Sequence, residues 1–228
     1  MNLYALVGLC FVPVVVLLSF FIFFVDSRRF HLYAISIALA LAAVIPASLI
    51  QYAAGVVPFF SAGTFLSLLC GSLILNGLVE ESVKFGFECL IPRKRMEFTL
   101  FFCCILLFGL TVGSFESIIY TLGKIQADVR HMGQTAAVRL IFRRMVSAQL
   151  VHLFCSALSG FSVWSLGGGQ RKIRALVSAV LLHGMYDFFM SFGKSFRFFA
   201  FAAIVLALVE IRQFYRETKY PQSEKERE

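Results

Sequence analysis

Residues 32–79 contain no aspartate, glutamate, lysine or arginine. A helix that crosses the hydrocarbon core of a bilayer needs about 20 apolar residues. The charge-free stretch is therefore long enough for two crossings, and Gly55 and Pro58 can separate them. The rest of the chain agrees, because 59% of its 228 residues are hydrophobic and it has 27 Phe but only 5 Pro. The sequence predicts an integral membrane protein.

Apolar length and the positions of Gly, Pro and charges predict an all-α, multi-pass transmembrane helical bundle of about seven helices. The predicted spans are 2–25, 31–54, 58–91, 97–120, 145–167, 173–192 and 196–214. The third is unusually long, because it continues past its charges until Pro92 stops it. Residues 1–214 are expected to form a single transmembrane domain. Residues 215–228 are expected to form a charged, disordered cytoplasmic tail.

Basic residues predict the orientation, because Lys and Arg in short loops stay on the cytoplasmic side. The loops after the first, third and fifth predicted spans and the C-terminal tail, counted together with Lys84, Arg174 and Arg212 in the adjoining parts of the spans, carry 14 of the 21 Lys and Arg residues. This bias predicts an N-terminus outside and a C-terminus in the cytoplasm. The expected location is the cell membrane, most simply a bacterial cytoplasmic membrane. No secretory signal is expected, because no Lys or Arg precedes Asp26.

Composition also excludes two classes of partner or site. The net charge of +8 comes from basic residues scattered over loops, which an anionic inner leaflet attracts, so no nucleic-acid partner is expected. The six cysteines show no paired spacing and mostly lie inside predicted spans. A disulfide framework or a zinc knuckle is therefore not expected, and the thiols are interpreted as small packing groups.

The third predicted span carries adjacent carboxylates, Glu80 and Glu81, with Lys84 one turn later, in an E-E-x-x-K pattern. Ionisable groups at membrane depth are costly and by default indicate a functional site. On a helical wheel they share one face with Asn76, Gly77 and Glu88. Glu80 and Glu81 stand i,i+4 and i,i+3 from Lys84, so either could pair with it. The alternative is that the pattern is only the solvated cytoplasmic end of a helix.

The fourth predicted span contains one carboxylate, Glu116, on a stripe with Gly109, Gly113 and Tyr120. The G-x-x-x-G spacing allows a second helix to approach closely. We therefore expect Glu116 to face protein and not lipid, the alternative being an interfacial glutamate near the end of the span.

Two further spans place histidines within the membrane. His152 lies on a face of small and polar residues in the fifth span, and His183 and Asp187 lie at i,i+4 in the sixth. Buried, hydrogen-bonded packing histidines are the alternative interpretation. With a rise of about 1.5 Å per residue, the four spans place their polar groups roughly 15 to 28 Å from the cytoplasmic helix ends, a spread that tilt can absorb. A common site requires the third helix to continue well beyond Glu80.

Taken in order, E-E-x-x-K, a glycine-rich helix with one Glu, a His followed by small residues, and H-x-x-x-D resemble the PrsW family of glutamic intramembrane proteases. The pattern is distantly similar to the type 2 CAAX prenyl endopeptidases and the Abi proteins. The resemblance covers roughly Asn76 to Asp187. The chain departs from the family pattern at Val112, where the family has Phe, and at Ser117, where Asn commonly follows the Glu.

The resemblance implies hydrolysis of a peptide bond in a single-span membrane protein or lipid-anchored peptide, such as an anti-sigma factor, by an activated water and without a cofactor. Glu80 is the expected general base, assisted by His152, and His183 would donate to the oxyanion. The implied catalytic residues are Glu80, Glu81, His152 and His183, and the implied supporting residues are Lys84, Glu116 and Asp187, of which Asp187 would orient His183.

Three alternatives use the same residues. Two His and three Glu could ligate zinc, although H-E-x-x-H is absent and Lys84 stands among the acids. A non-catalytic scaffold similar to the gamma-secretase Aph subunit would hold buried histidines, but that subunit lacks the acidic pair. A transporter would also use buried carboxylates, yet the chain shows no internal repeat.

Overall fold

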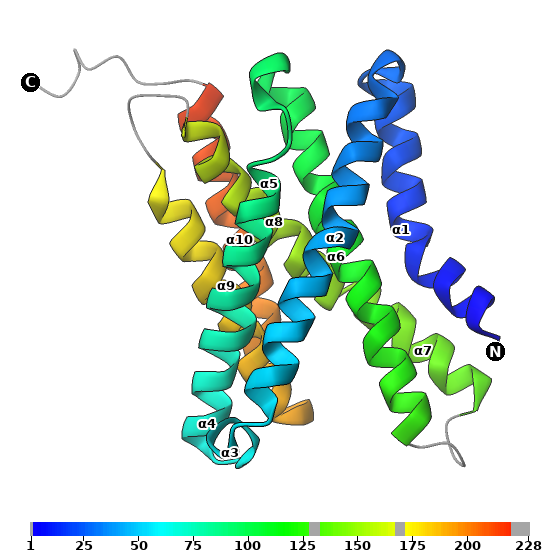
Figure 1. Ribbon diagram of the computed structural model, residues 1–228, viewed down its shortest axis with the longest axis vertical. Helices are drawn as coiled ribbons and strands as arrows, with labels where there is room; N and C mark the ends of the chain where they lie inside the picture. Colours follow the sequence, from blue (N-terminus) through cyan, green and yellow to red (C-terminus); the bar gives the residue numbers. More distant parts are fainter. Residues whose placement is uncertain (1, 128–132, 167–171, 220–228) are drawn as a thin grey trace, which may run out of the picture.

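The computed structural model of the protein describes residues 2–127, 133–166 and 172–219. These residues form helices and contain no strand. The helices are α1 (Leu3–Phe24), α2 (Phe30–Gly55), α3 (Pro58–Ser61), α4 (Phe65–Cys70), α5 (Glu81–Glu88), α6 (Phe98–Ala127), α7 (Gln134–Met145), α8 (Ala148–Ser165), α9 (Ile173–Ser191) and α10 (Arg197–Lys219) (Figure 1). A π-helical segment, η2 (Gly71–Glu80), joins α4 to α5, and 3-10 turns lie at Ser27–Arg29, Arg93–Arg95 and Gly193–Phe196.

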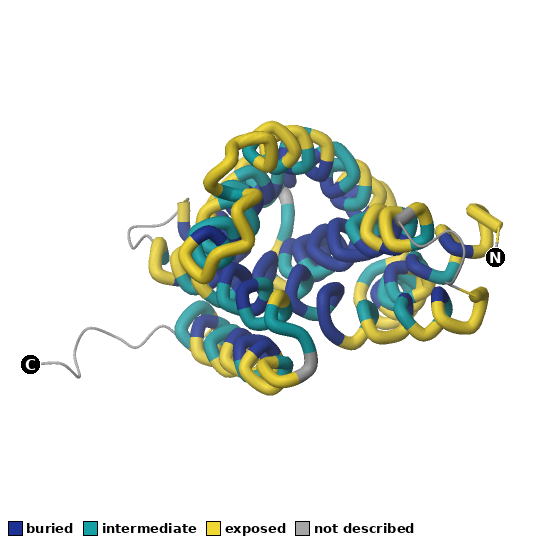
Figure 2. The backbone as a smooth tube through the Cα atoms, turned by 90° about the horizontal axis from the view of Figure 1, so that it is seen from below, coloured by how far each residue is buried: buried dark blue, intermediate teal, exposed yellow. Residues whose placement is uncertain are grey.

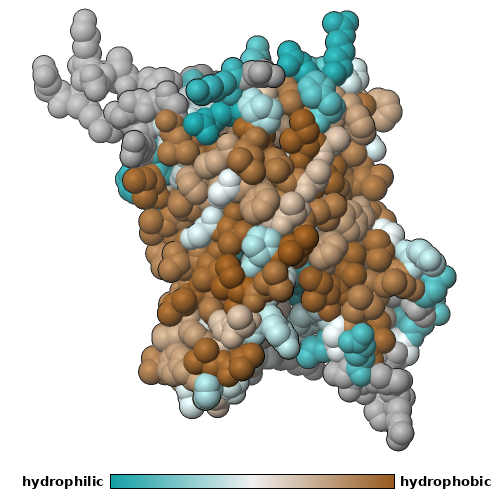
Figure 3. All heavy atoms as spheres, viewed as in Figure 1, coloured by the Kyte–Doolittle hydropathy of each residue, from teal (hydrophilic) through white to brown (hydrophobic). Residues whose placement is uncertain are grey.

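Seven helical runs within the described residues are long and apolar enough to cross a membrane. Their outer faces carry exposed large apolar side chains. On the face shown in Figure 3, hydrophobic residues cover most of the middle of the molecule, and most of the hydrophilic groups lie towards its ends. In water such a surface would be costly, whereas lipid solvates it. The predicted all-α bundle of seven membrane-spanning helices is confirmed.

The third span begins later than predicted. Pro58–Ser61 forms a separate helix, Gly63 has φ +66°, and the spanning run is Phe65–Glu88. The left-handed backbone at Gly63 breaks the chain, and Thr64 then caps the new helix by accepting a hydrogen bond from the backbone N–H of Ser67 (3.2 Å). The run still continues through Glu80 to Glu88, as a common site requires.

Two other boundaries differ near the fourth and fifth spans. Helix α6 extends to Ala127, beyond the predicted end at residue 120. The predicted fifth span, 145–167, is α8 alone, and it begins at Ala148 after a break from the separate helix α7. Ser147 makes this break with φ −136° and ψ −85°. The basic connection 121–144 thus contains a helix that the sequence analysis did not predict.

Helix α10 continues to Lys219, past residue 214, where the last span was predicted to end and after which the charged tail was predicted to begin. Its last turns are stabilised from the side: Phe214 is buried, and the Lys172 ammonium donates to the hydroxyl of Thr218 at 2.7 Å. The remaining part of the predicted tail, 220–228, lies outside the described residues.

Helices α6 and α8 form the centre of the bundle, and Figure 2 shows buried residues gathered inside a ring of exposed ones. The two helices touch through glycine. A Cβ at Gly109 would lie 2.6 Å from the backbone oxygen of His152, and one at Gly113 would lie 2.9 Å from Cα of Gln149. The G-x-x-x-G spacing therefore does permit the close approach that was predicted.

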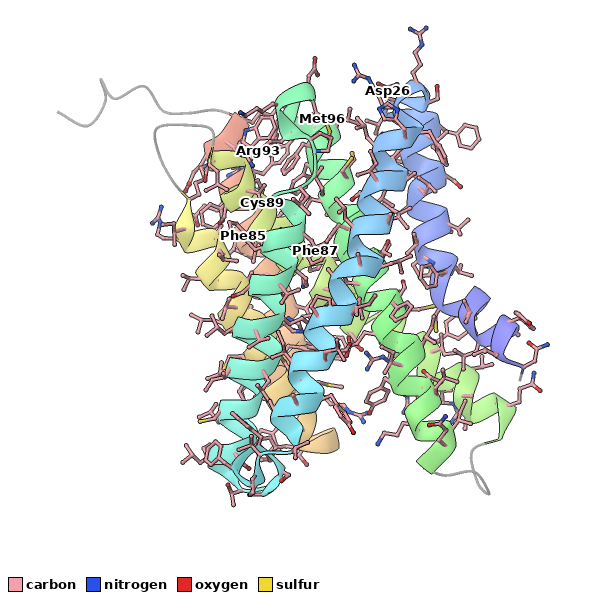
Figure 4. The ribbon with its side chains drawn as sticks, viewed as in Figure 1. Asp26, Phe85, Phe87, Cys89, Arg93 and Met96 are labelled. Atoms are coloured by element: carbon pink, nitrogen blue, oxygen red, sulfur yellow. The ribbon has the colours of Figure 1, made fainter. Side chains whose placement is uncertain are left out.

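The helix connections place several charged loops at the same end of the bundle. Asp26 in the α1–α2 turn and Arg93 and Met96 in the α5–α6 connection lie at this end, and α1 begins in the opposite half of the molecule (Figures 1 and 4). The predicted orientation assigns this end to the cytoplasm, and that assignment stays a prediction.

Candidate active site

The third span changes its helical geometry at the acidic pair. Segment η2 is a π-helix that ends at Glu80, and α5 begins at Glu81. Isolated π-helical turns are rare and are often found at functional sites. Gly77 lets η2 lie directly against α9, because a Cβ there would be only 2.5 Å from the backbone oxygen of Val180. This contact places the acidic pair beside the histidine of α9.

Glu80 is 8% exposed and has different neighbours on its two oxygens. Its Oε2 accepts a hydrogen bond from Nε2 of Gln51 on α2 at 3.2 Å. Its Oε1 lies 3.2 Å from Nδ1 of His152. Glu80 also lines a cavity of ≈ 20 Å³ between α2 and α6, together with Gln51, Lys84 and Glu116. A volume of this size accommodates about one water molecule.

His152 is held between two carboxylates. Its Nε2 contacts Oε2 of Glu116, and Glu116 is in turn paired with Arg144 (Nη2 to Oε2, 3.1 Å). The facing atoms Glu80 Oε1 and His152 Nδ1 are both buried and have no aligned hydrogen-bond partner. If Nε2–H points to Glu116, both facing atoms carry lone pairs. Atoms of this kind at 3.2 Å repel unless a proton or a cation lies between them.

Glu81 organises the second histidine. Its Oε1 accepts from the Lys84 ammonium at 2.6 Å and lies 2.6 Å from Nδ1 of His183. All three side chains are almost completely buried. Asp187 is farther from the ring, with Oδ2 3.7 Å from Nε2 of His183, which is beyond hydrogen-bond length. The carboxylate nearest to His183 is therefore that of Glu81, where the sequence analysis expected Asp187.

The Glu80–His152 pair and the Glu81–His183 pair meet at the two histidines. The centroids of the two imidazole rings are 4.8 Å apart, in an edge-to-face arrangement. Single ligand atoms of Glu80, His152 and His183 all lie within 4.8 Å of one another. The structure thus brings the seven residues singled out from the sequence into one contiguous network, with Asp187 at its margin.

Two contributors to the network, Gln51 and Arg144, and one buried carboxylate outside it, Glu88, were not assigned a role from the sequence. Gln51 is the one glutamine within residues 32–79, which was an available signal. Arg144 was counted as a loop charge, although it immediately precedes the predicted fifth span. Glu88 was placed on the polar face of the wheel, and the structure buries it completely, with Oε2 accepting from the hydroxyl of Ser159.

The residues present also fit a divalent metal ion. Glutamate and histidine are usual zinc ligands. Metal-binding histidines generally have their second ring nitrogen on a carboxylate or carbonyl, and here Glu116 and Glu81 occupy that position for His152 and His183. Glu80 Oε1 and His152 Nδ1 are the buried, unpartnered atoms such an ion would contact. The ammonium of Lys84 is paired with Glu81, which is not one of the three residues that would bind the ion.

Comparisons of the chain with curated proteins and with solved structures gave no match. A family model described as PrsW family intramembrane metalloprotease matches residues 28–211. This range includes every residue of the network described above. The description names a metal, whereas the sequence analysis expected no cofactor. The match covers most of the chain, which therefore belongs to the PrsW family and is a multi-pass membrane protein of the intramembrane protease class.

Proposed function

We propose that the protein hydrolyses a peptide bond in a single-span membrane protein or lipid-anchored peptide, with Glu80 as the general base that activates water. The observation that carries this proposal is the position of Glu80. It lies beside a cavity with room for one water and has one oxygen directed at an imidazole nitrogen. An anti-sigma-factor-like substrate, cut towards the outer side of the membrane, agrees with the predicted orientation.

In this mechanism Glu80 takes a proton from the water as the water oxygen attacks the scissile carbonyl carbon. The same carboxyl group then returns the proton to the amide nitrogen as the C–N bond of the tetrahedral adduct breaks, which releases an acid and an amine. Because the nucleophile is water, no acyl-enzyme intermediate forms. In the imidazolium form of His152, Nδ1–H faces Oε1 of Glu80 while Nε2–H meets Glu116, which fixes the ring. Base and ring are therefore pre-positioned before the substrate arrives.

The oxyanion that forms on the substrate needs a donor, and His183 is the candidate. Its Nδ1 faces Glu81, so the imidazolium form can donate through Nε2. The Lys84 ammonium balances the charge of Glu81. This division of tasks gives each carboxylate of the pair its own histidine.

A metal-dependent form of the same hydrolysis is the second candidate, favoured by the two facing atoms without partners. Glu80, His152 and His183 would hold the ion, which would supply Lewis-acid polarisation of the scissile carbonyl. Metal analysis of the purified protein, before and after treatment with 1,10-phenanthroline, separates the two forms. Full cleavage by metal-free protein supports Glu80 acting alone. Loss of metal and cleavage together, with recovery on adding Zn²⁺, supports the metal form.

The proposal is tested with Glu80→Gln in purified protein, reconstituted with a panel of single-span membrane proteins. Removing a general base is expected to slow cleavage by about 10² to 10⁴-fold. The glutamine keeps the size of the side chain, so the protein should accumulate and unfold like the wild type. Glu97→Gln is the matched control, since Glu97 is exposed in the α5–α6 connection. Wild-type cleavage by Glu80→Gln would reject the proposed role of Glu80.

A further inference from the structure

Arg144, in the last turn of α7, contacts three residues of one face of α6. Its Nη2 lies 3.1 Å from Oε2 of Glu116, and its Nε donates to the hydroxyl of Ser117 at 3.1 Å. Its guanidinium carbon lies 4.3 Å from the centre of the Tyr120 ring, at cation–π distance. The side chain is only 12% exposed. Charge, hydrogen bond and stacking together hold the guanidinium in one place.

The two other arginines of α7 differ from Arg144 in their exposure. Arg139 and Arg143 are exposed, as expected of basic residues that interact with lipid headgroups at the membrane surface. Arg144 is turned inward just before the break at Ser147, whose hydroxyl donates to the backbone oxygen of Arg143 at 2.7 Å. Arg143 and Arg144 are the same residue type, so the difference in their exposure comes from their positions at the end of α7.

Glu116 needs such a partner to keep its orientation. Its side chain is 42% exposed, so it has room to adopt other rotamers. The oxygen that Arg144 contacts, Oε2, is the oxygen that meets Nε2 of His152. The pair is a single ion-pair contact, since Nη2 makes no aligned hydrogen bond to the carboxylate. The guanidinium charge therefore attracts Oε2 of Glu116 from a position that Ser117 and Tyr120 fix. The ring of His152 in turn directs Nδ1 towards Glu80.

We propose that Arg144 is a positioning residue for hydrolysis: it fixes Glu116, and through Glu116 it fixes the imidazole of His152 beside Glu80. The inference rests on the proposed function, because the step it affects is water activation at Glu80. It also makes α7, which precedes α8 in the fifth spanning run, part of the active-site support. Ser117, which stands where the family commonly has Asn, is one of the groups that hold Arg144.

The first test measures cleavage by Arg144→Gln, Arg144→Lys and the matched control Arg143→Gln. A misplacement of about 1 Å near the reacting groups can cost about 100-fold, so Arg144→Gln should lower kcat by about 10- to 100-fold and leave KM unchanged. Arg144→Lys should recover part of the loss, because an ammonium keeps the charge but lacks the planar group that reaches Ser117 and stacks on Tyr120. Arg143→Gln should cleave like the wild type. Equal losses at 143 and 144 would overturn the proposal.

A double-variant comparison tests whether Arg144 acts through Glu116. In a Glu116→Gln background, Arg144→Gln should cause little further loss of kcat, because residues acting through one contact are not additive. A full additional 10- to 100-fold loss in that background would show a separate role and contradict the inference.

The second test does not depend on catalysis. The chain has four histidines, and ¹⁵N-histidine labelling gives ring signals that a His152→Gln variant assigns. Arg144→Gln should shift or broaden the His152 signals, and Arg143→Gln should leave them unchanged. If the wild-type protein cleaved no member of the substrate panel, the proposed function would fail while this test would still decide the inference. Unchanged His152 signals in Arg144→Gln would overturn it.

Discussion

Replacing Gly109 with alanine should push α6 and α8 apart beside His152. A Cβ at this position would lie 2.6 Å from the backbone oxygen of His152 and 2.6 Å from Cβ of Ser156. Non-bonded atoms prefer roughly 3.5 to 4.0 Å, so the helices must move apart locally by about 1 Å. Backbone cannot rotate away as a flexible side chain can. Such overpacking costs about 1–3 kcal/mol, and an active-site misplacement of about 1 Å can lower a rate by about 100-fold.

The assay combines thermal unfolding of the Gly109→Ala protein in detergent with its rate of cleavage of a single-span substrate. The expected result is lower stability together with a rate reduced by one to two orders of magnitude. Gly123→Ala is the control on the same helix, because a Cβ there meets no atom within 4 Å. If Gly109→Ala matched Gly123→Ala in both measurements, the tight α6–α8 contact would not position His152.

Two further substitutions test the buried charges. Lys84→Met leaves the carboxylate of Glu81 buried without its ammonium partner, so the free energy of unfolding should fall by about 3–5 kcal/mol. Arg29→Gln, which removes an exposed ion pair, should change it by less than about 1 kcal/mol, and equal effects would refute the argument. Ser159→Ala removes the hydroxyl that donates to Oε2 of Glu88. Since Oε1 of Glu88 has no hydrogen-bond partner in the wild type, the variant leaves both oxygens without one. It should cost about 1–3 kcal/mol in denaturant unfolding, and a neutral result would show that Glu88 does not depend on this bond.

The spans could be predicted because the bilayer requires long apolar helices with internal hydrogen bonding. The same criterion is insensitive to breaks inside an apolar stretch. Residues 58–64 carry no charge, like the first half of the span that follows, and only the backbone at Gly63 and the cap at Thr64 separate them. Helix α7 was missed for the opposite reason, since its arginines resemble those of a surface loop.

The site could be predicted in part because its chemistry depends on ionisable side chains, and such side chains are energetically costly inside membrane spans. Glu80, Glu116, His152 and His183 stand out in apolar spans for that reason. Gln51 does not stand out, because placing an uncharged amide in a membrane span costs less free energy than placing a charge there. Its importance comes from its hydrogen bond to Glu80, which lies on another helix. Contacts between distant segments of this kind are set by tertiary packing, which no local pattern in the sequence records.

Glu80 and Glu81 are neighbours in sequence, yet the structure gives them different surroundings. Glu80 ends the π-helical segment and lines the water-sized cavity, whereas Glu81 begins α5, does not line that cavity, and has Oε1 occupied by Lys84 and His183. Both Glu→Gln variants should therefore lose cleavage, but for different reasons.

The two variants should differ in stability. Glu81→Gln leaves the Lys84 ammonium buried without a counter-charge, so it should lower the free energy of unfolding by about 3–5 kcal/mol. Glu80→Gln keeps the hydrogen-bonding shape of the side chain and removes no direct ion pair with lysine, so it should unfold near the wild type. Unfolding in detergent, compared for the two variants, measures the difference. Equal stability of the two, together with equal loss of cleavage, would show that the carboxylates share one task, and the assignment of the base to Glu80 would lose its structural support.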